Sequence, residues 1–316
     1  MRLTRILMAL ISALTLASAV VTAESVDAPD PVRNDPSASL NPPAWLDEIA
    51  IRTHGVRLNG LVLVAAGTGP HPMLISLHGF PGTERNLDLA QVVRRAGYNV
   101  LFFDYRGVFG SGGNFSFANS LEDTAAVLAW ARSPDNVAKY HTDPQRLAIL
   151  GHSFGGWLAL MSGAQLPPRA CVAALAAWNV GWAAKRFADH PKERIDDLND
   201  LRTSTQETSG PVRANADALH AQMTAHAREW DYVTQAGALR NRSLLLVAAS
   251  RDTPDENAER HEELAAAIHA AGGTQVQTVN FDDDHQFSSH RIALADTLVH
   301  WLQGDCARSQ GANAAP

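Results

Sequence analysis

The sequence predicts an α/β fold with a doubly wound, mostly parallel sheet of eight strands. Short apolar runs alternate along the chain with amphipathic stretches whose apolar residues repeat at helical spacing. Most of these runs are apolar nearly throughout, which is typical of strands that helices cover on both faces. Strands that alternate with helices in this way form βαβ units and therefore a parallel sheet.

The predicted elements follow one another in a regular order. Residues 48–53 and 56–64 are expected to form an antiparallel ribbon at the sheet edge. Six further strands are predicted over residues 73–77, 99–103, 146–150, 172–177, 244–249 and 276–281, with helices over 86–96, 120–131, 154–165, 258–271 and 289–302. The last strand is mixed in polarity, so we expect it near a sheet edge.

Residues 181–241 interrupt this alternation. No strand is predicted there, and the composition is helical and polar. Trp182, Trp230 and Tyr232 favour a helical lid over the functional site, because aromatic side chains often line pockets. The alternative is a structural excursion that makes no contact with a substrate.

Residues 1–23 are predicted to be a cleaved signal peptide, which implies a secreted or periplasmic protein. Arg2 and Arg5 precede an apolar stretch over 6–21, and the small residues of Val21-Thr22-Ala23 suit cleavage. An uncleaved anchor is the alternative, but the apolar run is short for a membrane-spanning helix of about 20 residues. We therefore expect no membrane span in the mature protein.

The mature chain is expected to be one domain with polar ends. Residues 24–44 are predicted to be an extended linker, 45–305 the α/β domain and 306–316 a flexible tail. Loss of residues 1–23 leaves 24 basic residues against 33 acidic ones, a net charge of −9 with His counted as neutral. Such a chain lacks the basic surface that nucleic acids bind.

The two cysteines are predicted to be free thiols. Cys171 lies in an apolar run and Cys306 in the polar C-terminal segment, although an oxidising compartment would permit a bridge. Neither cysteine has companions at metal-ligand spacing, so no metal site is expected.

The segment Gly151-His152-Ser153-Phe154-Gly155 matches the pattern G-x-S-x-G of a nucleophile elbow. A predicted strand runs directly into it and a predicted helix follows directly after it. A strand that reverses into a helix within about two residues holds the serine in a strained conformation, which requires neighbours without bulk. Ser153 is therefore the predicted nucleophile, above the sheet and at a helix N-terminus.

A serine hydroxyl needs a base, and the base needs an orienting carboxylate. In folds with this elbow the order along the chain is Ser, then Asp or Glu, then His, each after a strand. Asp252 follows the strand 244–249 and His285 follows the strand 276–281, so His285 is the predicted base and Asp252 its partner. Asp255, three residues later, remains an alternative to Asp252.

Acyl transfer also needs N–H donors aimed at the oxyanion. One is predicted to be the backbone N–H of Phe154, directly after the nucleophile. The second is expected from the loop His78-Gly79-Phe80-Pro81-Gly82, which follows the strand 73–77. Pro81 has no N–H, so the N–H of Phe80 is the predicted donor.

Taken together, residues 45–302 resemble the α/β-hydrolase superfamily, in particular its branch of prolyl-oligopeptidase-type, serine aminopeptidase-like and dienelactone-hydrolase-like enzymes. The resemblance is carried by His78-Gly79-Phe80-Pro81-Gly82, Asp104-Tyr105-Arg106-Gly107 with Gly110-Ser111-Gly112, and Asp143-Pro144-Gln145-Arg146 leading into Gly151-His152-Ser153-Phe154-Gly155. The resemblance implies a hydrolytic Ser-Asp-His triad that uses no metal or organic cofactor. It also implies that Asp104 and Arg106 belong to a structural loop beside the oxyanion hole.

We therefore expect a serine hydrolase that cleaves a small carboxylic ester through an acyl-enzyme intermediate. Candidates for the wall of an apolar acyl pocket are Phe109, Phe115, Phe117 and the aromatic residues of the insertion. A serine aminopeptidase acting on small peptides is the alternative, and it needs a carboxylate near the pocket to bind the amino terminus. The insertion carries several, but a charge run is usually solvated. A non-catalytic binding protein normally has a broken triad, whereas this chain has every part.

Overall fold

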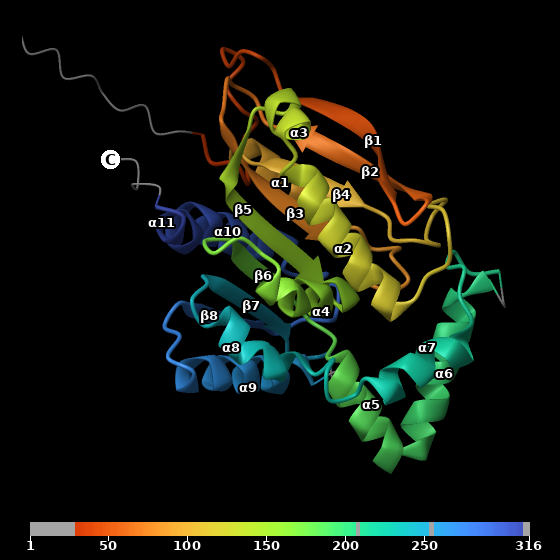
Figure 1. Ribbon diagram of the computed structural model, residues 1–316. Coiled ribbons are helices and arrows are strands. Elements are labelled where there is room, and N and C mark those ends of the chain that lie inside the picture. Colours follow the sequence, from red (N-terminus) through yellow and green to blue (C-terminus); the bar gives the residue numbers. More distant parts are fainter. Residues whose placement is uncertain (1–28, 207–208, 253–255, 312–316) are drawn as a thin grey trace, which may run out of the picture.

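The computed structural model describes residues 29–206, 209–252 and 256–311. Within these ranges, eight strands form one sheet in the order β1-β2-β4-β3-β5-β6-β7-β8 (Figure 1). The pairs β1–β2 and β2–β4 are antiparallel, and the five later pairs are parallel. The predicted mostly parallel sheet with an antiparallel ribbon at its edge is therefore confirmed.

The bounds of the elements lie close to those predicted. The strands are β1 (Trp45–Thr53), β2 (Val56–Val64), β3 (His71–Leu77), β4 (Asn99–Phe103), β5 (Thr142–His152), β6 (Cys171–Leu175), β7 (Leu244–Ala249) and β8 (Val276–Phe281). The α-helices are α1 (Leu87–Arg95), α2 (Phe117–Ala131), α3 (Pro134–Lys139), α4 (Phe154–Met161), α5 (Val180–Asp189), α6 (Pro191–Ser204), α7 (Ala216–Ala225), α8 (Ala236–Leu239), α9 (Asn257–Ala270), α10 (Arg291–Trp301) and α11 (Ala307–Ser309). Among the predicted strands β5 differs most, because it begins four residues before the apolar run.

Each face of the sheet is covered by its own set of helices. Alternate residues of a strand point to opposite faces, so Leu244 and Leu246 of β7 pack in one core and Leu245 and Val247 in the other. Helices α2, α4 and α9 contribute to the first core, and α1 and α10 to the second. Strand β8 lies at the sheet edge and is half-buried, as its mixed polarity predicts.

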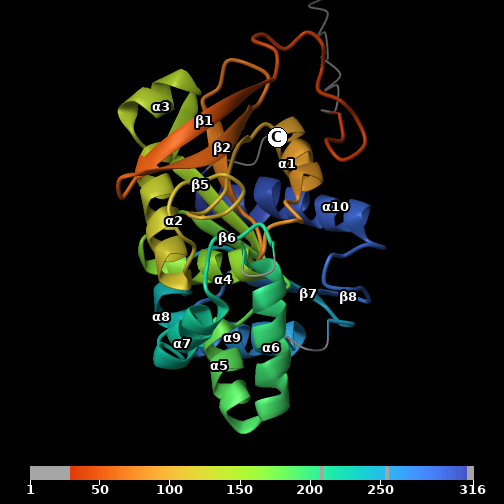
Figure 2. The same cartoon turned by 90° about the vertical axis from the view of Figure 1, so that its right-hand side faces the viewer.

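The segment predicted as a lid is helical and contains α5 to α8. Figure 2 shows α5 and α6 extending away from the sheet. Trp230 and Tyr232 do not belong to a lid surface, because both are buried in the first core. Among the described residues, every helix is too short or too polar to span a bilayer.

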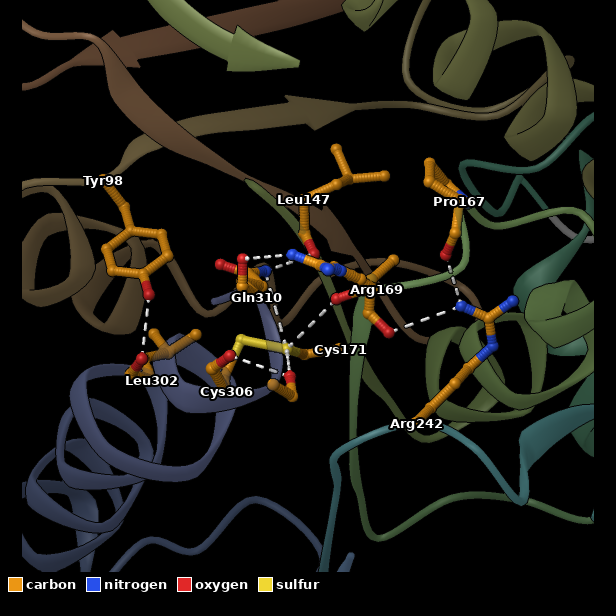
Figure 3. Close-up of a disulfide and its surroundings, with 11 residues drawn as sticks. Tyr98, Leu147, Pro167, Arg169, Cys171, Arg242, Leu302, Cys306 and Gln310 are labelled. Atoms are coloured by element: carbon orange, nitrogen blue, oxygen red, sulfur yellow. Dashed lines mark hydrogen bonds between the residues drawn. A yellow bond between two sulfur atoms is a disulfide. The ribbon is translucent and has the colours of Figure 1, made fainter. Parts of the chain in front are cut away.

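The prediction of two free thiols is wrong, because Cys171 and Cys306 form a disulfide with their Cα atoms 5.7 Å apart (Figure 3). Cys306 does not lie in a polar tail. It ends a π-helical turn over Leu302–Cys306 that continues α10, and its side chain is fully buried against the second core. The sequence identified the polar residues around Cys306 but not the helix that buries it.

The predicted flexible tail is also wrong over its first residues. Helix α11 covers Ala307–Ser309, and the buried Gln310 side chain donates to the backbone oxygen of Leu147 at 2.8 Å. The Tyr98 hydroxyl holds the preceding turn by donating to the oxygen of Leu302 at 2.9 Å (Figure 3). Residues 312–316 lie outside the described residues.

The predicted linker and signal peptide are described only in part. Residues 29–44 contain turns without a helix or strand, and the Arg95 side chain donates to the oxygen of Pro31 at 2.7 Å. This segment therefore lies against α1. The predicted signal peptide, residues 1–23, lies outside the described residues.

Removal of the disulfide should destabilise the protein without changing its fold. The bond joins residues 135 positions apart, so breaking it releases a long loop in the unfolded chain. We expect the double variant Cys171→Ala, Cys306→Ala to lose about 2–4 kcal/mol of unfolding free energy, measured by urea denaturation. Reductant should lower the unfolding free energy of the wild type by a similar amount and leave that of the double variant unchanged. Equal stability of reduced and oxidised wild type would contradict this expectation.

Candidate active site

Ser153 is the single residue between the end of β5 and the start of α4. Its backbone has φ 56° and ψ −120°, a combination that a non-glycine residue adopts only under strain. The Ser153 backbone N–H donates to the backbone oxygen of Leu175 at 2.9 Å, and the Ser153 backbone oxygen accepts from the N–H of Trp178 at 3.1 Å. Both partners lie at or just beyond the end of the neighbouring strand β6, which fixes the turn.

The two glycines of the motif are required by the space around them. A Cβ atom at Gly151 would lie 1.9 Å from the oxygen of Gly155, and one at Gly155 would lie 2.1 Å from the oxygen of Leu77. No side chain fits at such distances. The helix therefore packs directly on the backbone of β3, as the motif predicts.

The predicted base and its predicted carboxylate partner are in contact. Asp252 follows β7 and His285 follows β8, and His285 Nδ1 is hydrogen-bonded to Asp252 Oδ2. An ionised carboxylate only accepts hydrogen bonds, so the His285 proton in this contact lies on Nδ1. Asp255, the alternative partner, lies outside the described residues.

Asn257, which the sequence analysis missed, supports this pair. Its side-chain nitrogen donates to Asp252 Oδ2 at 2.6 Å, and its side-chain oxygen accepts from the N–H of Ala249 at 3.0 Å. Asn257 is fully buried at the start of α9 and thereby fixes the Asp252 carboxylate to the end of β7. No motif singles out an asparagine at this position.

The two residues predicted to supply the oxyanion donors lie beside Ser153. A Cβ atom added to Gly79 would lie only 3.7 Å from Ser153 Oγ, so this loop lies against the serine side chain. Phe80 lines the same cavity as Ser153. Within the described part of the chain, no backbone–backbone hydrogen bond of the turns and loops uses the N–H of Phe80 or Phe154 as its donor.

A buried polar cluster lies behind this loop. Arg85 Nη2 is 3.2 Å from Asp104 Oδ1, and His78 Nε2 is 3.8 Å from the same oxygen. Burial raises the pKa of Asp104 to about 6 against the opposing effect of Arg85. Burial also lowers the pKa of His78 to about 4, so this ring is neutral near pH 7. Asp104 thus touches the base of the oxyanion loop, in agreement with its predicted structural role.

Arg106, the other predicted scaffold residue, is bonded away from the cavity. Its Nε donates to Asp123 Oδ1 at 2.6 Å, and its Nη2 donates to Glu122 Oε2 at 2.6 Å. These bonds tie the loop after β4 to α2.

Ser153 and His285 line one cavity of about 710 Å³. Its aromatic wall consists of Phe80, Trp178, Trp182 and Phe187. Trp182 comes from the insertion, as predicted. Phe115 and Phe117, by contrast, are buried in the first core, and Phe109 packs against that core. Helices α5 and α6 supply most of the other lining residues, so the insertion contacts the site and is not a remote excursion.

One wall of the cavity is acidic. Glu193, Asp196, Asp197 and Asp200 of α6 line it together with Arg186 of α5. Asp196 and Asp200 are exposed, so the charge run is solvated and also contributes to the cavity wall. Spacing of three or four residues places the four carboxylates on one side of the helix, where they face the cavity.

The insertion is joined to the segment that follows Asp252. Arg186 pairs with Glu193 at 2.5 Å and with Glu256 at 2.9 Å. The Trp182 ring lies near two guanidinium groups, with Arg260 of α9 5.0 Å and Arg186 5.3 Å from its centroid. No group of three or more His, Cys, Asp or Glu among the described residues is arranged to hold a metal ion.

A sequence model of the alpha/beta hydrolase family matches residues 74–297. The chain belongs to this family. The shared segment contains β3 to β8 without the first residues of β3 and includes Ser153, Asp252 and His285.

Individual relatives are similar over shorter stretches. An uncharacterised protein of Mycobacterium tuberculosis is 33% identical over 139 residues, or 43% of this chain and 47% of that protein. A lysophosphatidylserine lipase of Danio rerio is 27% identical over 174 residues, or 48% and 43% of the two chains. The chain spans about half the length of the curated relatives it matches.

A solved esterase of Pyrococcus furiosus has a similar fold. Its TM-score is 0.60 at 18% identity, and the match covers 82% of the present chain and 91% of the esterase chain. At this identity the likeness shows the shared fold alone.

Asp104 should make folding stability pH-dependent. Its pKa is raised in the folded protein, so the stability contributed by its protonated form is complete below the ordinary value of 3.8 and is lost as the pH rises through about 6. Asp104→Asn removes this titration. We expect the melting temperature of the variant to fall less between pH 4.5 and 7.5 than that of the wild type, measured by calorimetry. An equal or larger fall in the variant would contradict the assignment.

Proposed function

We propose that this protein hydrolyses carboxylic esters with Ser153 as nucleophile, His285 as general base and Asp252 as the group that orients His285. The observation that carries the proposal is the juxtaposition of a strained serine with a carboxylate-bound histidine in one cavity. A histidine oriented by a carboxylate is the kind of base that activates a serine hydroxyl, and strained backbone conformations cluster at active sites.

The proposed reaction has two steps. Ser153 Oγ attacks the ester carbonyl while His285 Nε2 takes the hydroxyl proton, and the N–H groups of Phe80 and Phe154 bind the oxyanion. The carbon–oxygen bond then breaks, the alcohol leaves with the proton from His285, and an acyl-Ser153 ester remains. Water, deprotonated by His285, attacks this ester and releases the carboxylic acid and free Ser153.

The cavity supports an ester of modest size. A volume of about 710 Å³ accommodates a small molecule, and the aromatic side chains of its wall suit an apolar acyl group. The partial similarity to a lipase supports ester cleavage as well. A triad alone does not distinguish esters from amides, so the choice of an ester substrate depends on the apolar character of this wall.

The acidic side of the same cavity favours one second candidate, an aminopeptidase for small peptides. Glu193, Asp196, Asp197 and Asp200 provide carboxylates that suit the ammonium group of a peptide amino terminus. Glu193 is already paired with Arg186 and Asp197 also has a partner within the protein, so Asp196 and Asp200 are the candidate partners of such a group.

We also propose that the protein is exported. A disulfide persists in oxidising compartments and is rare in the cytosol, and the predicted signal peptide implies the same destination. The two observations are independent, because one rests on residues 1–23 and the other on Cys171 and Cys306.

The function is tested by turnover of a short-chain p-nitrophenyl ester. We expect Ser153→Ala to lose at least about a thousandfold in kcat and Asp252→Asn to lose about 10²- to 10⁴-fold. Ser162→Ala is a matched control, because its hydroxyl bonds to the oxygen of Leu158 and lies outside the cavity lining. Equal turnover by wild type and Ser153→Ala would reject the proposed mechanism.

The same preparations distinguish the second candidate. An ester hydrolase should cleave the ester much faster than an aminoacyl-p-nitroanilide. Faster cleavage of the anilide, abolished by N-acetylation of its amino group, would establish the aminopeptidase instead.

A further inference from the structure

His152, the residue before the nucleophile, contacts the residue proposed as the base. Its side chain is 3% exposed, and its Nε2 lies 2.8 Å from the backbone oxygen of His285. The two imidazole rings lie 4.8 Å apart between centroids. The G-x-S-x-G pattern leaves this position unspecified, so the motif gives His152 no role.

The hydrogen bond fixes the protonation of the His152 ring. A backbone oxygen only accepts hydrogen bonds, so His152 Nε2 carries the proton and donates a hydrogen bond to the backbone oxygen of His285. Burial, together with the proximity of His285 and Arg291, lowers the pKa of His152 to about 3. The ring is therefore neutral at the pH at which a histidine base works. His152 therefore adds no positive charge beside the imidazolium that forms on His285 during acyl transfer.

The sheet alone does not bring these residues together. Strands β5 and β8 are separated by β6 and β7, so their ends lie about 14 Å apart at the usual strand spacing. The segment after β8 must therefore turn back across the carboxyl edge to reach Ser153. Asp252 holds the His285 ring through Nδ1, but Asp252 is itself fixed, through Asn257, to the end of β7 and not to the turn that carries Ser153. The bond from His152 is a direct link between the nucleophile turn and the backbone of His285.

We propose that His152 is a positioning residue, whose N–H holds the backbone of His285 at a fixed distance from Ser153. The proposal rests on the proposed function, because the positioning matters only if His285 is the base of Ser153. One contact then fixes the His285 backbone and a second, from Asp252, fixes its ring. An error of about 1 Å in such a placement can cost about a hundredfold in rate.

Three substitutions separate the hydrogen bond from simple packing. His152→Leu keeps an apolar side chain of similar size without a donor. His152→Gln places an amide N–H where Nε2 lies, whereas the shorter His152→Asn reaches only as far as Nδ1. Gln and Asn are therefore a matched polar pair, of which only Gln can donate to the oxygen of His285.

The experiment measures kcat and KM for the p-nitrophenyl ester and the rate of fluorophosphonate labelling. We expect kcat and the labelling rate to fall about 10- to 100-fold in the Leu and Asn variants and to recover in the Gln variant. KM should change by less than about threefold in all three. Melting temperatures identify variants that do not fold, and the Gln–Asn pair still decides if the Leu variant fails to fold.

Two results overturn the proposal. Wild-type kcat in folded His152→Asn shows that the bond is dispensable, and a folded His152→Gln as slow as His152→Asn shows that a donor does not restore the function. In both cases loss of turnover in Ser153→Ala leaves the proposed function intact. Turnover of the wild type that does not depend on Ser153 would overturn both the positioning role and the proposed function.

Discussion

The backbone of Ser153, held at φ 56° between a strand and a helix, is the constraint on which the site depends. A residue in this region costs about 1–3 kcal/mol and persists only where its surroundings determine it. Here they do: Gly151 and Gly155 admit no Cβ atom, and hydrogen bonds to Leu175 and Trp178 fix both peptide groups of the turn. Without this close packing of α4 on β5 and β3, the hydroxyl would not face the cavity.

The remaining parts of the site converge because the strands are parallel. The carboxyl ends of β3, β5, β7 and β8 meet at one edge of the sheet, which places Phe80, Ser153, Asp252 and His285 on neighbouring loops. Covering this edge, α5 and α6 line the cavity with aromatic residues on one side and carboxylates on the other. The loops are arranged around a sheet of the family's fold, and the insertion contributes most of the residues that line the cavity.

The sequence predicted the sheet well because its strands are buried on both faces and therefore read as apolar runs. Ser153, Asp252 and His285 could be proposed as a triad because each lies three or four residues beyond such a run. The sequence did not predict features that depend on contacts between residues far apart in the chain. Cys306 lies among polar residues, yet a continued helix buries it against Cys171. The acidic residues of α6 look like a solvated face, and only the placement of the helix turns them toward the cavity. Asn257 and His152 lie at positions that no motif restricts.

The most direct test of the account is to identify the residue that a fluorophosphonate modifies. The folded wild-type protein is labelled, digested and analysed by mass spectrometry, with heat-denatured protein as the control. We expect one adduct, on Ser153, that forms only in folded protein, because only the folded turn places the hydroxyl in the cavity that His285 also lines. An absence of labelling, or an adduct on a different residue, would contradict the assignment of Ser153 as the nucleophile.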